Sequence, residues 1–256
     1  MQPMRNLKLT VAYDGTNYHG FQDQGREDRP TIQRELERAW ERLVGEQVKM
    51  IGAGRTDAGV HAEGQVANFR THSSSIPAER VPYAMNSVLP PDVRVIGCVE
   101  VPSDFHARFW AVGKQYVYRI DNRPFPSPLV RHFTHFIPHP LDVDAMDEAA
   151  KHLVGRHDFR ALAGAGHAGR TTIRTITRCD VTAQDGLVVI TVEADAFLYH
   201  MVRTIAGTLV EVGQGTHPPS WVREVIASRQ RSRAGPTLPG KGLTLMRVDY
   251  PPLGLR

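Results

Sequence analysis

Several stretches of the chain alternate apolar and polar residues with the period of two that is typical of β-strands. Near the N-terminus, for example, Leu7, Leu9 and Val11 fall on one side of such a stretch. Other stretches repeat their apolar residues every three to four positions, which predicts helices with one buried face. We therefore expect strands over residues 6–14, 48–51, 65–70, 93–101, 114–121, 173–183, 187–194 and 243–248, and helices over 32–44, 77–89, 143–154, 197–212 and 221–228.

Residues at the expected helix ends agree with this assignment. Thr31, Asp142 and Ser220 precede three of the helices, where their side chains can cap free backbone N–H groups. Gly45 follows the first helix, at the position where glycine most often ends one.

The order of elements repeats once along the chain. Each half has a strand, a loop, an inward-facing helix and further strands, and the second half begins near Pro102. This order predicts two related α+β lobes rather than a short-period repeat. We place the lobes at residues 1–103 and 104–256.

Composition narrows the class of protein. The 256 residues are 41% hydrophobic and 23% charged, which fits a soluble globular protein, and no apolar stretch approaches the length of a membrane span. Cys98 and Cys179 lie far apart in expected strands, so free thiols and a cytoplasmic location are expected. The net charge of +4 permits a polyanionic partner without requiring one.

The most chemically suggestive stretch is GAGRTDAGVHA at residues 52–62. Small residues surround Asp57 just after an expected strand, which suits a nucleophile or a general base. An ordinary turn aspartate is the alternative that composition leaves open. A dinucleotide fingerprint is disfavoured, because Asp57 stands where the third glycine would be and would face the pyrophosphate.

This stretch also carries a family resemblance. Residues 54–62, GRTDAGVHA, resemble the catalytic signature of the tRNA pseudouridine synthase A family. Further stretches match that family in order along nearly the whole chain. They are YDGTNYHGFQ at 13–22, FHARF at 105–109, KQYVY at 114–118, AFLYHMVR at 196–203, GL at 242–243 and VDYP at 248–251.

The resemblance implies a fold and a reaction. The fold is α+β, with two RRM-like lobes whose antiparallel sheets join into one extended sheet, helices packed on it, and an active-site cleft between the lobes. The reaction converts uridine to pseudouridine in the anticodon stem-loop of tRNA, at positions 38–40. Because this isomerisation oxidises nothing and imports no group, it needs no organic cofactor and no metal.

Three residues are implied to carry the chemistry. Asp57 is the catalytic carboxylate, and whether it attacks ribose C1′ or uracil C6 stays open. The resemblance implies that Arg203 holds this aspartate by a salt bridge. The alternative is a solvent-facing arginine, which the otherwise apolar helix disfavours because a charge in its midst needs a partner. Tyr116 stacks on the target base. Tyr118 lies on the same side of the expected strand, so only the resemblance selects Tyr116 over Tyr118.

Other residues are candidates for binding the substrate. Leu243 forms a wall of the uracil pocket or is a plain core leucine. A uridine in a stem must be unstacked and turned outward, and Arg55 either fills the vacated space or contacts a phosphate. The aromatic residues of the loop after the first strand either stack on RNA or pack locally, and two basic segments form a phosphate-contacting rim. These candidates are Tyr18, His19 and Phe21 in the loop, and Arg170 and Arg231 in the rim.

The expected partner is tRNA, which lies across both subunits of a homodimer in the family. Three closely spaced histidines, His132, His135 and His139, are a weak metal signal, because no cysteine pair is available to complete a zinc site. A non-catalytic RNA-binding module on the same scaffold is the alternative function.

Overall fold

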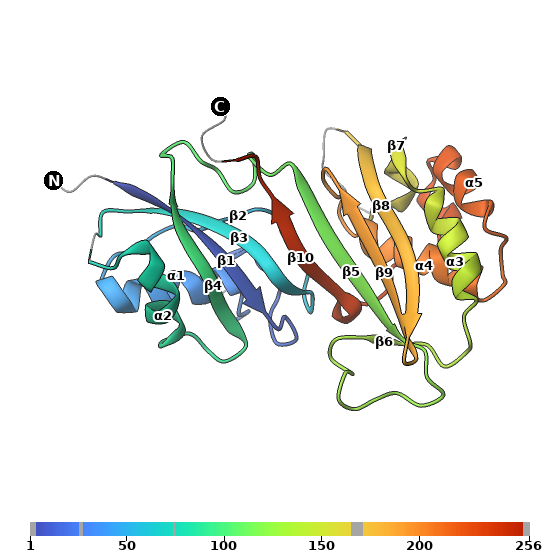
Figure 1. The fold of residues 1–256 in the computed structure, drawn as a ribbon, viewed down its shortest axis with the longest axis horizontal. Coiled ribbons are helices and arrows are strands. Elements are labelled where there is room, and N and C mark those ends of the chain that lie inside the picture. The colour runs from blue at the N-terminus through green and yellow to red at the C-terminus, as the bar shows by residue number, and fades with distance from the viewer. Residues whose placement is uncertain (1–3, 26–27, 74, 165–170, 253–256) are drawn as a thin grey trace. The chain divides into compact units, whose positions relative to one another are not determined.

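The computed structural model describes residues 4–25, 28–73, 75–164 and 171–252. The chain forms two compact units (Figure 1). The first unit comprises Met1–Val112 and Leu245–Arg256, and the second comprises Gly113–Thr244. Both contain helices and antiparallel strands, which confirms the expected α+β class.

The sheet of the first unit has the strand order β4-β1-β3-β10, with β2 also paired to β3. In the antiparallel register, Leu9 of β1 lies opposite Ala67 of β3 on one side and Cys98 of β4 on the other. The strands are β1 (Arg5–Tyr13), β2 (Ile51–Gly52), β3 (His61–Thr71), β4 (Val93–Val101) and β10 (Leu243–Asp249).

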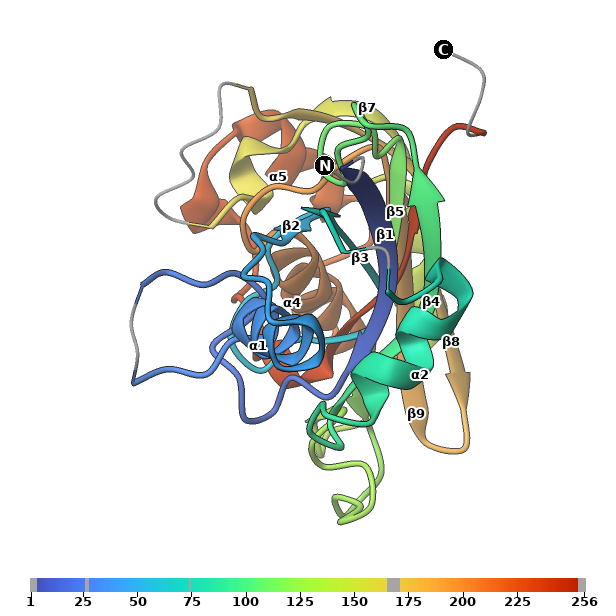
Figure 2. The ribbon, with the colours of Figure 1, turned by 90° about the vertical axis from the view of Figure 1, so that its left-hand side faces the viewer.

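Two helices, α1 (Ile32–Val44) and α2 (Val81–Asn86), accompany this sheet (Figure 2). The apolar side of β1 is fully buried, as the period of two predicts, and the Trp40 ring of α1 meets the Phe69 ring of β3 at 4.8 Å between centroids. Burial of this helix face against the sheet therefore forms the main core of the unit. Gly45 ends α1 with a positive φ of 72°, but the Thr31 side chain makes no capping hydrogen bond at its start. Of the other two expected caps, Asp142 accepts the Ala145 N–H, whereas the Ser220 side chain makes no capping bond.

A smaller core involves the segment that follows β4. The buried amide of Asn6 donates to the carbonyls of Pro102 and Phe105, both at 3.0 Å, and Asn68 accepts from the Ala107 N–H at 2.8 Å. Phe105 then packs among buried apolar residues of the first unit. Because these contacts attach residues 102–107 to the first sheet, the unit extends to Val112, beyond the division at 103/104 that the order of elements predicted.

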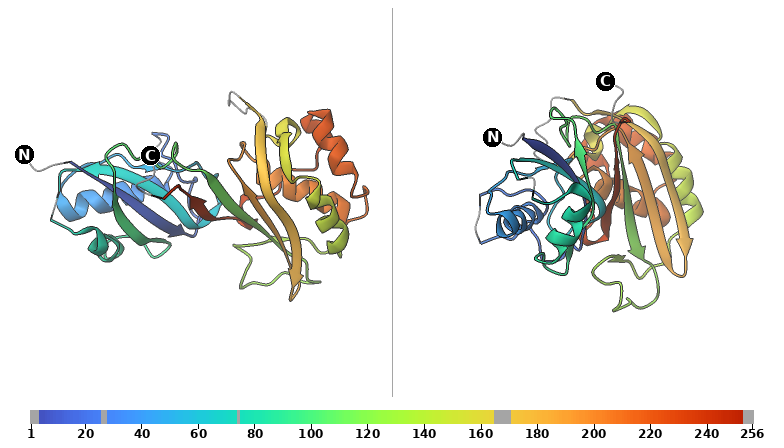
Figure 3. Two further views of the ribbon diagram at one scale, coloured as in Figure 1. Left: turned by 45° about the horizontal axis from the view of Figure 1, so that its top comes forward. Right: turned by 60° about the vertical axis from the view of Figure 1, so that its left-hand side comes forward.

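The second unit has the strand order β5-β9-β8-β7, with the short β6 parallel to β5. Tyr118 of β5 and Val181 of β8 both lie opposite Ile190 of the central β9. Helices α3 and α4 pack on this sheet and on each other (Figure 3). The elements are β5 (Gly113–Asp121), β6 (His135–Phe136), α3 (Val143–Lys151), β7 (Gly155–Asp158), β8 (Ile173–Gln184), β9 (Leu187–Ala194), α4 (Met201–Gly213) and α5 (Trp221–Ser228).

Most strands and helices agree with the sequence prediction, and the differences have local causes. The strand expected over residues 48–51 is observed as β2, which has only the two residues Ile51–Gly52. Helix α4 begins at Met201 rather than near Phe197, since His200 adopts a left-handed φ of 60° that no helix continues through. Within the described ranges, no helix is long and apolar enough to cross a membrane.

One buried carboxylate in the second unit leads to a prediction about pH. Asp121 accepts bonds from Arg123 Nε at 2.7 Å and from the Ser127 N–H at 2.8 Å. The Arg123 guanidinium holds the pKa of the Asp121 carboxyl below its usual range, against the opposing effect of desolvation. A depressed pKa means that the carboxylate stabilises the fold above the unfolded pKa of about 4 and loses this effect as the pH falls through the folded pKa.

We therefore expect Asp121→Asn to lower the urea midpoint of unfolding at pH 7 and equally at pH 5, with the difference from wild type shrinking below about pH 4. Asp185→Asn, in the exposed turn between β8 and β9, is the control for loss of an exposed charge; because asparagine is favoured at its φ of 52°, the midpoint should not fall, and the difference from wild type should not vary with pH. A difference that stays constant on acidification would show that the contribution of Asp121 is not ionic.

Candidate active site

Asp57 lies on a loop that leaves the first sheet at the end of β2. The last ladder bond before the loop runs from the Ala53 N–H to the Val66 carbonyl, at 2.7 Å. Asp57 itself is partly buried, and its carbonyl accepts the Val60 N–H at 3.2 Å across a turn in which Gly59 has a φ of 72°. The carboxylate thus stands just before a tight turn, with small residues on the C-terminal side.

The motif at residues 13–22 packs directly on this loop. Two backbone hydrogen bonds join the motif to the loop. The Phe21 N–H donates to the Thr56 carbonyl at 3.2 Å, and the Tyr18 carbonyl accepts the Gly59 N–H at 3.3 Å. Two glycines make this close approach possible. A Cβ on Gly15 would lie 2.0 Å from the Val60 oxygen, and one on Gly20, which has a φ of 85°, would lie 2.1 Å from the Thr56 oxygen. The two motifs are therefore one structural unit around Asp57.

Within residues 13–22, the rings of Tyr18 and Phe21 are buried, whereas that of His19 is exposed. Tyr18 is 7% exposed, with its hydroxyl donating to Asp92 at 2.7 Å, and Phe21 is 2% exposed. Local packing, the alternative to RNA stacking, thus describes these two rings, because the Tyr18 hydroxyl is bound to Asp92 and the Phe21 ring lies against Gly52. His19 is exposed beside the loop, and Arg55 is exposed with its Nε donating to Gln22 Oε1. Arg170 lies outside the described residues.

Tyr116 and Tyr118 lie on the same side of β5 but differ in their surroundings. The Tyr118 hydroxyl donates to the Pro239 carbonyl at 2.9 Å, its ring is fully buried, and burial raises its pKa. Tyr116 is 8% exposed and its ring meets Phe197 edge to face at 5.1 Å. Tyr118 is committed to the core by its own contacts, so Tyr116 is the better candidate for a role with substrate.

Arg203 is partly buried in the first turn of α4 and is tied to the segment 234–238. Its Nε donates to the Leu238 carbonyl at 2.7 Å, and its own carbonyl accepts the Leu238 N–H at 3.2 Å. The segment lies very close to α4, since a Cβ on Gly207 would lie 1.8 Å from the Pro236 oxygen. Leu243, which begins β10 five residues after this segment ends, is 6% exposed.

Arg231 makes hydrogen bonds within the protein, a role that the clustering of basic residues along the sequence does not predict. Its guanidinium donates to the Gly235 carbonyl at 2.9 Å and to Thr237 Oγ1 at 2.8 Å, both in the same segment that holds Arg203. These bonds use the charge to fix a turn, so Arg231 supports α4 and its surroundings rather than standing as an open phosphate contact.

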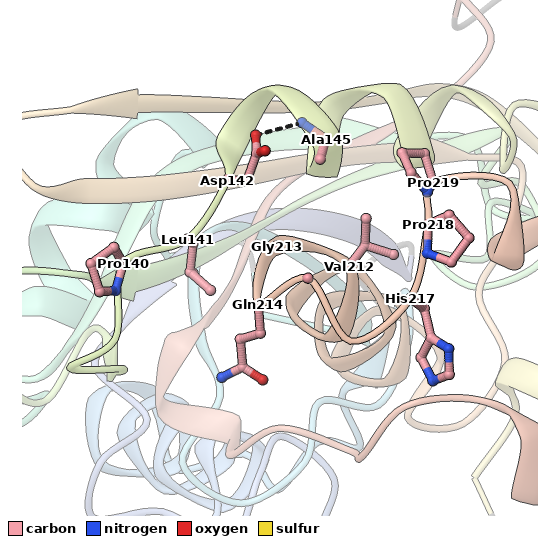
Figure 4. A pocket seen from close by; sticks show the side chains of 11 residues that line it. Pro140, Leu141, Asp142, Ala145, Val212, Gly213, Gln214, His217, Pro218 and Pro219 are labelled. Carbon is pink, nitrogen blue, oxygen red and sulfur yellow. Dashed lines mark hydrogen bonds between the residues drawn. The ribbon is translucent and has the colours of Figure 1, made fainter.

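A surface depression lies elsewhere in the second unit (Figure 4). Its walls come from the start of α3 and the end of α4, and they include Leu141, Val212 and His217. The predicted site residues of this unit, Tyr116, Arg203 and Leu243, are not among its walls. Among the described residues, no three His, Cys, Asp or Glu side chains gather as ligands of a metal ion would.

Comparison with known proteins gives a consistent result. The family model described as tRNA pseudouridine synthase matches residues 9–110 and 149–251. The tRNA pseudouridine synthase A of Acetivibrio thermocellus is 49% identical over 247 residues, which cover 96% of this chain and 100% of that protein. The tRNA pseudouridine synthase A of Myxococcus xanthus is 50% identical over 249 residues, covering 96% and 92%.

Proposed function

Because this chain belongs to the tRNA pseudouridine synthase A family, and so isomerises uridine to pseudouridine in tRNA, we propose that the carboxylate of Asp57 carries the reaction. The isomerisation breaks the bond between ribose C1′ and uracil N1, turns the base and joins C1′ to C5, while C5 loses its proton and N1 gains one. A carboxylate assists by adding to the sugar or the base, or by stabilising the detached sugar.

The observation that supports this role is the way in which the Asp57 loop is held. Backbone bonds from residues 13–22 and from β3 fix the residues on both sides of Asp57, while the side chain stays partly exposed. A catalytic group needs both conditions, because it must meet substrate in a defined geometry.

We propose that Arg203 pairs with this carboxylate in the active enzyme, as the family resemblance implies. A guanidinium beside a carboxylate favours its ionised form and fixes its orientation. The bond from Arg203 Nε to Leu238 supports this role, because it restricts the arginine to one direction. Tyr116 is proposed to stack on the uracil, and Leu243 to bound the pocket that holds it.

The RNA contacts are proposed from exposure and charge. Arg55 of the Asp57 loop and His19 of the adjoining residues 13–22 are both exposed, and they are proposed to contact the nucleotides next to the flipped uridine. Arg170 is proposed as a phosphate contact. The buried rings of Tyr18 and Phe21 serve instead to support the loop.

The site on tRNA and the assembly follow from the family. We propose that the enzyme modifies positions 38–40 of the anticodon stem-loop, acts as a homodimer with one tRNA across both subunits, and works in the cytoplasm where tRNA is found. No cofactor is required, because the reaction rearranges a single nucleotide.

The direct test is to incubate an unmodified tRNA transcript with the purified protein alone and map pseudouridine at each position. Pseudouridine confined to positions 38–40, with no additive present, is the expected result. Modification elsewhere in the tRNA would refute the anticodon arm as the target. Tight tRNA binding without any product would favour a non-catalytic RNA-binding module.

A further inference from the structure

The loop that carries Asp57 is attached to the sheet by few backbone bonds. β2 pairs with β3 only at Ile51 and Gly52, and Ala53 makes the last ladder bond. Beyond it, the loop contains glycines at positions 54 and 59, which have no side chains to pack against the sheet. Residues 13–22 bind the loop through their backbone, and the Phe21 carbonyl in turn accepts the Gln33 N–H of α1 at 2.9 Å. Buried side chains of the sheet add further contacts that fix the loop, and with it Asp57, to the strands.

Two buried polar side chains of the sheet meet this loop. Gln65 of β3 is 0% exposed, and its Nε2 donates to the Gly54 carbonyl at 3.1 Å. Tyr13 at the end of β1 shares a buried 2.8 Å hydrogen bond with Thr56 Oγ1. Gln65 also acts on the Tyr13 hydroxyl, lowering its pKa against the larger effect of burial, and the two residues lie on neighbouring, paired strands.

The bonds of these two side chains reach the loop on both sides of Arg55. Gly54 is held through its backbone, and Thr56, directly before Asp57, is held through its side chain. Burial raises the pKa of Tyr13 to about 12, so its hydroxyl keeps its proton at neutral pH. Inside the protein such bonds are strong and directional, because water does not compete for them.

We propose that Tyr13 and Gln65 are positioning residues for the isomerisation, which hold the Asp57 carboxylate in reacting geometry through Thr56 and Gly54. This inference rests on the proposed role of Asp57. Neither residue contacts the substrate. Their effect on catalysis should be large, because a catalytic group displaced by about 1 Å can lose roughly 100-fold in rate.

The test measures kcat and KM for tRNA below the unfolding temperature of every variant. Tyr13→Phe and Thr56→Val each remove one side of the same hydrogen bond and keep the packed volume nearly unchanged. Each should lower kcat by roughly 10- to 100-fold, with KM within about twofold of wild type. The double variant should be no worse than either single one, since both remove one interaction. Thr56→Ser keeps the oxygen and should retain most of the activity.

Tyr250→Phe is the matched control. The Tyr250 hydroxyl donates to the Ala107 carbonyl at 2.7 Å in the same unit, so the variant removes a partly buried tyrosine hydrogen bond without touching the Asp57 loop. It should lower the unfolding temperature as Tyr13→Phe does and leave kcat unchanged.

An unchanged kcat in Tyr13→Phe and Thr56→Val would overturn the positioning role, and so would an equal loss of kcat in Tyr250→Phe. Asp57→Asn, assayed alongside, separates this failure from a failure of the proposed function. If Asp57→Asn is inactive while Tyr13→Phe is normal, only the positioning role is wrong. If Asp57→Asn is active, the assignment of the carboxylate is wrong.

Discussion

Asp57→Asn is expected to abolish turnover while tRNA binding survives. Asparagine is nearly isosteric with aspartate, so the backbone bonds from residues 13–22 to the loop should remain. It has no anionic oxygen with which to add to the nucleotide or to stabilise the detached sugar. We expect kcat to fall by roughly 1000-fold or more, and the dissociation constant for tRNA to stay within about threefold.

This experiment needs single-turnover assays of pseudouridine formation and a direct binding measurement. Asp104→Asn is the matched control, because Asp104 is an exposed aspartate of the same unit, outside the loop. Formation of pseudouridine by Asp57→Asn at a rate near wild type would remove Asp57 from the mechanism. Loss of tRNA binding together with activity would point to a role in binding instead of chemistry.

Arg203→Lys has the second largest expected effect. Arginine can hold the Leu238 carbonyl with Nε while its planar fork faces a carboxylate, whereas a single ammonium group cannot reproduce both contacts in fixed geometry. We expect kcat to fall by roughly 100-fold with a smaller change in KM, because the charge is kept but the orientation of Asp57 is lost. Arg223→Lys, on the exposed side of α5, should have no effect on either parameter.

A double-mutant cycle shows whether the two residues act together. If Arg203 acts through Asp57, adding Arg203→Lys to Asp57→Asn should reduce the residual rate no further. Two effects that multiply would mean that Arg203 acts independently of the aspartate. Circular dichroism and thermal unfolding of Arg203→Lys will show whether the bonds to the segment 234–238 survive.

Much of the fold follows from local patterns. β4 and β9 have the predicted bounds, and α1 ends at Gly45 as predicted, because alternation and helix-ending residues are local properties of the chain. The start of α4 was missed because apolar spacing continues through residues 197–200, whereas His200 turns left-handed there. Periodicity carries no information about a single backbone angle.

The candidate site was predictable where it depends on residue type and order. The small residues around Asp57 mark a loop that other groups can approach, and the order of the motifs identifies the family. The supporting residues were not predictable. In the sequence Gln65 is an ordinary polar residue of an expected strand. Only the structure shows that it is buried and that its side chain binds the Gly54 carbonyl of the Asp57 loop. Arg231 likewise looks like part of a basic surface until its bonds to Gly235 and Thr237 are seen.

The sequence alone determined the α+β class, most of the elements, the family and the residues that qualify for the chemistry, since each depends on neighbours along the chain. Only the tertiary structure decided that residues 13–22 and the Asp57 loop form one unit, that the rings of Tyr18 and Phe21 are buried, and that residues 102–112 belong to the first unit. The physical reason is that burial and hydrogen-bond partners depend on segments that are distant in sequence, and no local pattern records which of them will meet.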